Sequence, residues 1–99
     1  MSGSFGSYKL SPLAQADLEE IWLYTFKEWS REQADTYYAG FVAAFEGLAL
    51  GEKIGRPVDA RDGYFKCAVG SHCVFYRQSA SGLEITRILH QRMDPATQL

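Results

Sequence analysis

The sequence has few or none of the features that mark several large classes of protein. Two cysteines among 99 residues are too few for a disulfide scaffold, and their spacing is not that of a C-x-x-C zinc or redox motif. No apolar run approaches the roughly 18 residues that a transmembrane helix requires. The sequence therefore predicts neither a disulfide-stabilised fold nor a membrane protein.

Motifs for common cofactors and hydrolases are also missing. The chain has no G-x-G-x-x-G, no P-loop, no H-E-x-x-H and no G-x-S-x-G pattern. These patterns bind dinucleotides, nucleoside triphosphates and catalytic zinc, or present a nucleophilic serine. We therefore expect no cofactor and no metal site.

The N-terminal residues lack the basic segment and the apolar core of a signal peptide. Residues 1–7 are instead rich in Gly and Ser, which predicts a flexible leader. We expect one domain over residues 8–94, a C-terminal tail over residues 95–99, and a cytoplasmic location.

The residues that are present suit one small core. The chain is 46% hydrophobic and 14% aromatic, which excludes a disordered composition. A domain of this size buries about two-thirds of its surface on folding. The net charge is −2, yet residues 1–50 carry three bases against seven acids and residues 51–99 carry seven against five. This asymmetry indicates either a polarised surface or merely helix charges of one sign offset by strand charges of the other. Because the net charge is small, we expect no direct sequence-specific nucleic-acid binding.

Two helices are predicted in the acidic half. Ser11-Pro12 is a strong helix start, because Ser is a good N-cap and Pro fits the first helical position. Apolar residues spaced three and four apart then predict a helix from Pro12 to Trp29. Ser30 to Gln33 has the form of a capping box, and the second helix should end before Gly51. With almost no linker between them, the helices should form an antiparallel hairpin.

Short strands are predicted on both sides of the helices. Residues 8–10 form a possible first strand, and residues 64–69, 72–78 and 83–90 are rich in aromatic and β-branched side chains. Gly and Pro mark residues 52–63 as a loop. The predicted order is β-α-α-β-β-β, an α+β domain with a helical hairpin packed on a small antiparallel sheet.

The turn chemistry sets the strand register. Gly70-Ser71 suits a type II′ hairpin that pairs Val69 with His72 and places Cys67 and Cys73 on opposite faces of the sheet. Two registers remain open for the second hairpin. A bulged turn would pair His72 with the histidine at position 90, whereas a tight two-residue loop would shift the register by one and separate the two rings.

Basic and imidazole side chains gather on the predicted strands and just after them: Arg77, Arg87, His90 and Arg92, with His72 as a further candidate. Arginine beside histidine can bind phosphate and move protons, as a metal-independent ribonuclease requires. The structural alternative is that Arg77 or Arg87 pairs with Glu84 and that His90 caps the last strand.

The apolar helix faces are wider than one core needs. Aromatic residues at helical spacing belong first to the core, but Tyr24 and Val42 fall off the main apolar stripes. Excess apolar surface on a small domain is typical of a partner-binding surface.

Three stretches of the chain, in order, resemble the ParE family of the RelE/ParE superfamily of bacterial toxins. The first is Tyr8–Ala14 with Asp17–Trp22 and Tyr24-Thr25, the second is His72–Arg77, and the third is Glu84–Asp94. Together with the spacing through Trp29 and Gln33-Ala34, the likeness covers residues 8–94.

The resemblance implies a RelE/ParE-like fold and a non-enzymatic toxin of a type II toxin–antitoxin system. Such a toxin inhibits DNA gyrase, blocks replication and arrests growth, and a ParD-like antitoxin neutralises it by folding on its surface. The superfamily also implies an alternative, a RelE-like endoribonuclease (mRNA interferase) using Arg77, Arg87 and His90. The C-terminal tyrosine of such nucleases has no counterpart after Tyr76.

These partners give two predicted surfaces. We expect contact with the target, and hence toxicity, to depend on the basic end of the chain: Arg87, His90, Arg92 and Met93. We expect the antitoxin to bind apolar residues of the helical hairpin: Trp22, Tyr24, Tyr38, Val42 and Phe45.

Overall fold

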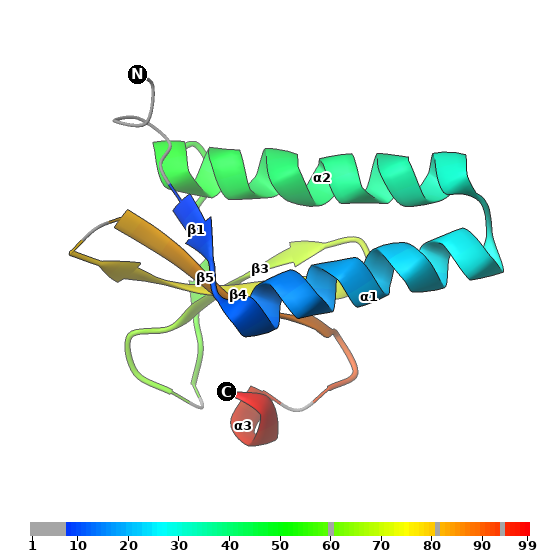
Figure 1. The fold of residues 1–99 in the computed structure, drawn as a ribbon. Helices are drawn as coiled ribbons and strands as arrows, with labels where there is room; N and C mark the ends of the chain where they lie inside the picture. Colours follow the sequence, from blue (N-terminus) through cyan, green and yellow to red (C-terminus); the bar gives the residue numbers. More distant parts are fainter. Residues whose placement is uncertain (1–7, 60, 81, 94) are drawn as a thin grey trace.

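The computed structural model describes residues 8–59, 61–80, 82–93 and 95–99. A helical hairpin lies on one side of a five-stranded sheet and a short helix lies on the other (Figure 1). The predicted α+β class is confirmed, and the leader predicted at residues 1–7 lies outside the described residues. The elements, in chain order, are β1 (Tyr8–Leu10), α1 (Pro12–Glu28), α2 (Arg31–Leu50), β2 (Arg56–Pro57), β3 (Phe65–Val69), β4 (His72–Ser79), β5 (Gly82–His90) and α3 (Pro95–Gln98).

Local capping sets the ends of the two long helices. The Ser11 hydroxyl accepts the Ala14 N–H at 3.0 Å and also donates to the Thr86 carbonyl at 2.8 Å, which ties the start of α1 to β5. Ser30 accepts the Gln33 N–H at 3.0 Å at the start of α2. Gly51 ends α2 in the left-handed conformation, with φ 81°. The predicted helix starts and the glycine stop are confirmed.

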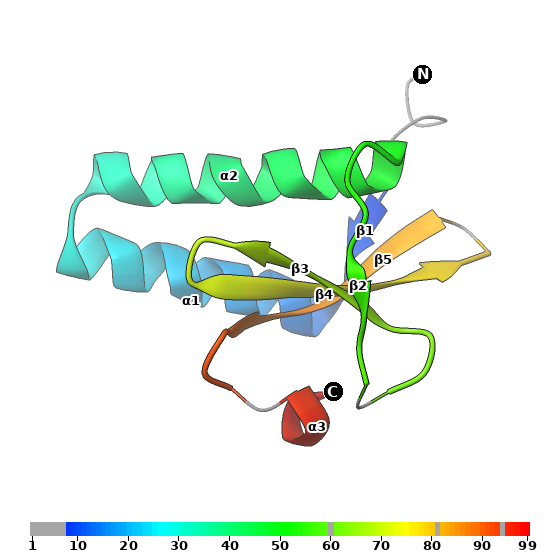
Figure 2. The same cartoon turned by 180° about the vertical axis from the view of Figure 1, so that it is seen from behind.

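The sheet has the strand order β1-β5-β4-β3-β2, and β1 runs parallel to β5. The prediction of an antiparallel sheet is therefore wrong at this edge, because the long helical connection after β1 permits parallel pairing, whereas tight turns enforce antiparallel pairing. Figure 2 shows β2 beside β3 at the opposite edge.

Two short elements depart from the sequence predictions. The strand β2 falls in the segment predicted as loop, since two residues carry no periodic signal. The C-terminal tail, for which no helix was predicted, contains α3. Its C-terminal neighbour Leu99 packs on a small cluster formed by Val58, Phe75 and Leu89.

The main core lies between the helical hairpin and the sheet. Its largest fully buried side chains are Phe41, Phe45, Ile85 and Val74. Cys67 packs against this core, whereas Cys73 packs against the second cluster on the other face. The predicted separation of the two cysteines is confirmed, and both are free thiols.

The first hairpin, between β3 and β4, has the predicted register. Val69 lies opposite His72, and Gly70 has φ 58°. No non-glycine residue in the described part of the chain has a positive φ, so Ser71 has a negative φ, as a type II′ turn requires.

The second hairpin combines the two registers left open by the sequence. Ser79 lies opposite Gly82, which is the register of a tight two-residue loop. A bulge opposite Phe75 and Tyr76 then makes Thr86 the extra residue and shifts the pairing by one. The Thr86 hydroxyl donates to the Phe75 carbonyl at 3.0 Å. Beyond the bulge the two histidines are directly opposed, as in the bulged-turn alternative, but the bulge lies inside the strand and the turn itself has the register of the tight loop.

Candidate functional site

A groove runs between α1 and the paired ends of β4 and β5. It consists of two adjoining cavities of about 370 and 400 Å³, and both are lined by Tyr24, His72 and His90. The Tyr24 side chain is 65% exposed and that of Trp29 is 76% exposed, so aromatic surface borders the opening. We call this feature the histidine groove. A concave site with a few convergent polar groups is the usual form of a binding site.

The two imidazole rings at the centre of the groove touch each other. Their centroids lie 5.2 Å apart in a T-shaped arrangement. His90 Nδ1 accepts the Arg92 N–H at 3.2 Å, so the neutral ring carries its proton on Nε2. The alternative in which His90 caps the end of the last strand is therefore confirmed.

The position of His72 depends on Tyr37 of α2. The Tyr37 hydroxyl lies 2.8 Å from His72 Nδ1 and accepts the Ser71 N–H at 3.1 Å. A Cβ atom on Gly70 would lie only 2.6 Å from this hydroxyl. The turn between β3 and β4 therefore packs directly against the Tyr37 side chain. The sequence alone gave no sign of the contact between this tyrosine and the histidine.

Stability should depend on pH through His72. Burial lowers the pKa of His72 below its ordinary value of 6.5, and the neighbouring His90 acts in the same direction, whereas Asp17 opposes the shift. The stabilising contribution of the neutral ring is complete above pH 6.5 and is lost as the pH falls towards the lower pKa of the folded chain. Between pH 7.5 and pH 5.0, the free energy of unfolding measured with urea should fall more in the wild type than in His72→Gln. An equal loss in both proteins would contradict this assignment.

Arg87, which the sequence assigned to both target contact and the ribonuclease set, is held by Asp17. Its Nε and Nη2 donate to the two carboxylate oxygens at 2.8 and 3.0 Å. The same carboxylate accepts the Ile88 N–H at 3.0 Å. The Arg87 and Asp17 side chains are only 19% and 14% exposed. Arg87 lines the histidine groove, but its fork is already occupied by a carboxylate.

Arg77 lies far from the other members of the predicted ribonuclease set. Its Nε donates to Glu84 at 2.9 Å, so the structural alternative is confirmed for this arginine. Glu84 and His90 lie six positions apart on β5, roughly 20 Å along an extended strand. The prediction that Arg77, Arg87 and His90 gather at one site is therefore wrong, because Arg77 pairs near the other end of the hairpin.

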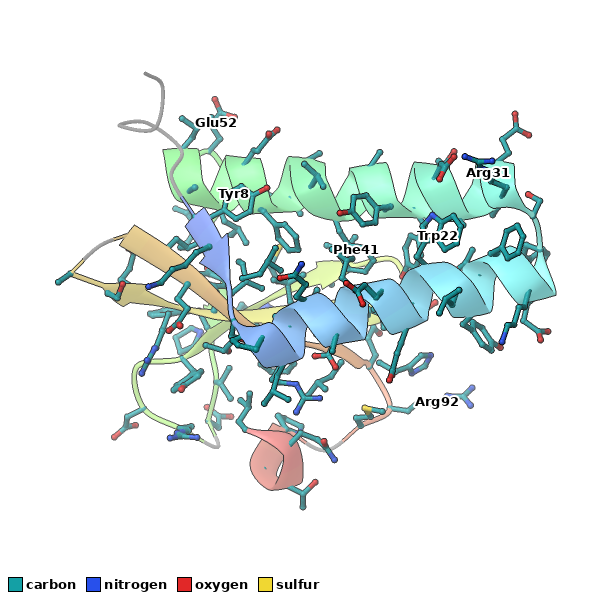
Figure 3. All side chains as sticks on the ribbon, viewed as in Figure 1. Tyr8, Trp22, Arg31, Phe41, Glu52 and Arg92 are labelled. Atoms are coloured by element: carbon teal, nitrogen blue, oxygen red, sulfur yellow. The ribbon has the colours of Figure 1, made fainter. Side chains whose placement is uncertain are left out.

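The remaining residues predicted for target contact lie at the edge of the histidine groove. Met93 lines it and is 49% exposed. Arg92 is exposed and extends away from the body of the molecule (Figure 3). Both residues follow His90, the last residue of β5, and both are exposed.

The residues predicted to bind the antitoxin do not form one surface. Phe45 is fully buried against Tyr8 and Phe41, so its inclusion was wrong. Helical spacing had placed it on an apolar face without showing which face the sheet covers. Tyr24 lines the histidine groove instead, and Val42 is half-buried.

Trp22 and Tyr38 line a separate groove between α1 and α2, with a volume of about 490 Å³. Leu23 and the carboxylates Glu19 and Asp35 complete its lining. The Trp22 Nε1 donates to Asp35 at 3.0 Å. We call this feature the hairpin groove. It joins an apolar surface to an acidic border.

Among the described residues, no group of three or more His, Cys, Asp and Glu side chains is arranged to hold a metal ion. Nor does any helix in that part of the chain have the length and apolar character needed to cross a membrane.

The fold and its two grooves define a small two-layer α+β protein with large contact surfaces for its size. The family model described as the ParE toxin of the type II toxin–antitoxin system parDE matches residues 8–95. The chain belongs to this family, as the resemblance in its sequence implied.

Two curated relatives are similar over nearly their whole length. Toxin ParE1 of Mycobacterium tuberculosis is 46% identical over 89 residues, which cover 88% of this chain and 91% of the relative. Toxin ParE1 of Caulobacter vibrioides is 43% identical over 93 residues, covering 93% and 96% respectively. A chain from the solved chromosomal ParDE toxin–antitoxin system of P. aeruginosa has a TM-score of 0.75 at 22% identity, covering 85% of this chain and 94% of that chain. That likeness supports the RelE/ParE-like fold.

Proposed function

We propose that this ParE toxin acts in the cytoplasm by inhibiting DNA gyrase through protein contact and that a ParD-like antitoxin holds it inactive. Family membership supports a toxin with an antitoxin partner. The observation that carries the non-enzymatic part is the pairing of the two arginines expected in a nuclease. Arg77 binds Glu84 and Arg87 binds Asp17. Neither guanidinium is left free beside His90 to stabilise a transition state.

The histidine groove and the segment after it form the proposed target-binding surface. Exposed Tyr24, Trp29 and Met93 supply apolar contact area, and Arg92 supplies an exposed arginine at the edge. Aromatic residues, methionine and arginine are enriched in the parts of protein interfaces that carry most of the binding energy.

A supercoiling assay tests the proposed target. Purified toxin, freed of antitoxin, should block the ATP-dependent supercoiling of relaxed plasmid by gyrase. The double variant Arg92→Ala/Met93→Ala should inhibit at least about tenfold less, because each exposed anchor contributes roughly 1 kcal/mol or more. Lys27→Ala, on the exposed surface of α1, is the control and should inhibit like the wild type. Normal supercoiling in the presence of excess wild-type toxin would rule out gyrase as the target.

The histidine pair keeps a ribonuclease as the second candidate function. His72 and His90 lie in an open groove and could exchange protons with a substrate. We expect no cleavage when the toxin is added to ribosomes translating an mRNA. Cleavage that disappears in His90→Ala would favour the ribonuclease over the gyrase inhibitor.

The hairpin groove is the proposed antitoxin surface. Leu23 is 48% exposed and Tyr38 is 43% exposed, and Glu19 and Asp35 border them. A disordered antitoxin segment that folds as an amphipathic helix could place apolar residues in the groove and basic residues against this border.

Replacing Tyr38 with Asp should weaken binding of a ParD-like antitoxin at least about tenfold, because it places a charge in the apolar part of the groove. Calorimetric titration measures the affinity directly. Leu13→Asp is the matched control, since Leu13 is 60% exposed and lines neither groove. Unchanged affinity for Tyr38→Asp would exclude the hairpin groove. If Tyr24→Asp loses affinity instead, the antitoxin binds in the histidine groove.

A further inference from the structure

The face of the sheet opposite the helical hairpin carries basic side chains without acidic partners. Arg56 of β2 lies directly opposite Lys66 of β3. Within the described part of the chain, neither forms an ion pair, in contrast to Arg77 and Arg87. Two adjacent cations at neutral pH repel each other, so an anion bound between them would stabilise both.

A hollow lies beside these two cations. It has a volume of about 300 Å³ and is lined by Arg56, Lys66, Ala68, Cys73 and Gln91, with no carboxylate among them. The small residues Ala68 and Cys73 are direct partners in the β3–β4 pairing. Burial raises the pKa of Cys73, with Lys66 opposing the shift, so the thiol stays neutral and adds no negative charge to the hollow.

Gln91, on one side of the hollow, is held by two hydrogen bonds to backbone carbonyls. The Gln91 N–H donates to the Ser71 carbonyl at 2.9 Å, and the Gln91 side chain donates to the Gly70 carbonyl at the same distance. The amide nitrogen of Gln91 has a second hydrogen to donate. The hollow therefore combines a guanidinium, an ammonium and an amide in one place.

More positive charge continues along the same face. Tyr64, just before β3, packs against the cluster of Val58, Phe75 and Leu89 on this face of the sheet. The guanidinium of Arg61 lies 4.9 Å from the centre of the Tyr64 ring. That of Arg77 lies 5.8 Å from the same ring, but it is paired with Glu84 and adds no net charge. Most acids of the chain lie in the helical half, which carries seven of the twelve. At physiological salt, charges more than about 8 Å away are largely screened, so the local charge of this face matters more than the total of −2.

We propose that the hollow between Arg56 and Lys66 is an anion site for a backbone phosphate of DNA, and that it engages the DNA held by the target enzyme. The choice of gyrase-bound DNA rests on the proposed function. A guanidinium fork and a lysine ammonium are the usual ligands of a phosphate group. Such contacts position a protein on DNA without reading its sequence, which agrees with the expectation that this toxin has no sequence-specific binding.

Fluorescence anisotropy with a labelled DNA duplex, without gyrase, tests the site. The slope of log K against log salt concentration should become shallower by about one for each phosphate contact removed. Arg56→Ala/Lys66→Ala should therefore reduce the slope by about two and weaken binding at low salt. The double variant Lys27→Ala/Lys53→Ala makes the same change in net charge elsewhere and should keep the wild-type slope.

Three results would overturn the proposal. The first is equal slopes and affinities in the two double variants, and the second is no duplex binding by the wild type at low salt. The third is binding of ATP alone, without binding of the duplex, that is lost in Arg56→Ala/Lys66→Ala, because it would assign the hollow to free nucleotides.

The supercoiling assay separates this proposal from the proposed function. If wild type and Arg56→Ala/Lys66→Ala inhibit gyrase equally, the DNA contact is wrong while gyrase remains the target. If the wild type binds duplex through these residues but does not inhibit gyrase, the proposed target is wrong and the engagement of gyrase-bound DNA falls with it.

Discussion

Replacing Asp17 with alanine is expected to lower the free energy of unfolding by about 2–4 kcal/mol, a large fraction of the stability of a small domain. The substitution removes two hydrogen bonds to the Arg87 guanidinium and one to the Ile88 N–H. It leaves a guanidinium that is only 19% exposed without its counter-charge. Urea unfolding followed by circular dichroism measures the loss.

The expected effect is large because Asp17 completes the open edge of β5. The parallel strand β1 pairs with β5 only as far as Ile85. The Ser11 hydroxyl then donates to the Thr86 carbonyl, and the Asp17 carboxylate accepts the Ile88 N–H. The Asp17 carboxylate thus accepts a backbone N–H of β5 beyond the end of β1 and connects α1 to the sheet. A backbone N–H deprived of such a partner is unfavourable when it is partly buried.

Glu20→Ala is the control for the loss of a negative charge from α1, and we expect it to change stability by less than about 0.5 kcal/mol. The double variant Asp17→Ala/Arg87→Met should be more stable than the sum of the two single losses implies, because removing both partners leaves no unpaired charge. A loss below about 1 kcal/mol in Asp17→Ala would show that the ion pair is not important for stability.

This role of Arg87 changes how its variants should be interpreted. A variant of Arg87 that loses toxicity could do so by unfolding rather than by losing a target contact. Arg92 and Met93 are better probes of toxicity, since both are exposed and neither bridges α1 and β5. Comparing them with Arg87 at a temperature where all remain folded would separate contact from stability.

The parts of the fold that depend on neighbouring residues were predictable from sequence. Caps at Ser11, Ser30 and Gly51 act within one helical turn, and the turn at Gly70 fixes the β3–β4 register through its own φ. The parallel pairing of β1 and the bulge at Thr86 were not predictable. Both depend on contacts between segments far apart in the chain, which propensity and periodicity do not report.

The candidate site shows the same division. Direct pairing of the two histidines was expected for one of the two registers considered, and the sequence alone did not decide between them. The link between Asp17 and Arg87 spans 70 residues and left no local pattern. Periodicity also could not show that Tyr24 and Tyr38 line different grooves, because it gives the angle around a helix but not the direction of its neighbours.

Replacing Phe45 with alanine is expected to lower the free energy of unfolding by about 3–5 kcal/mol. The ring is fully buried between α2 and the sheet, 5.4 Å from the Tyr8 ring and 6.3 Å from that of Phe41, centre to centre. Its removal leaves a cavity that these rings can only partly fill. Tyr38→Ala is the matched aromatic control on the same helix and should lose less than about 1 kcal/mol, because Tyr38 is 43% exposed.

Antitoxin binding then distinguishes a core residue from a contact residue. Because a ligand of the folded state stabilises it, excess antitoxin should restore much of the folded population of Phe45→Ala. Tyr38→Ala should stay folded and yet bind the antitoxin more weakly. Thermal unfolding with and without antitoxin measures both effects. If Phe45→Ala were as stable as Tyr38→Ala, the core described for this toxin would be wrong at the contact between α2 and β1.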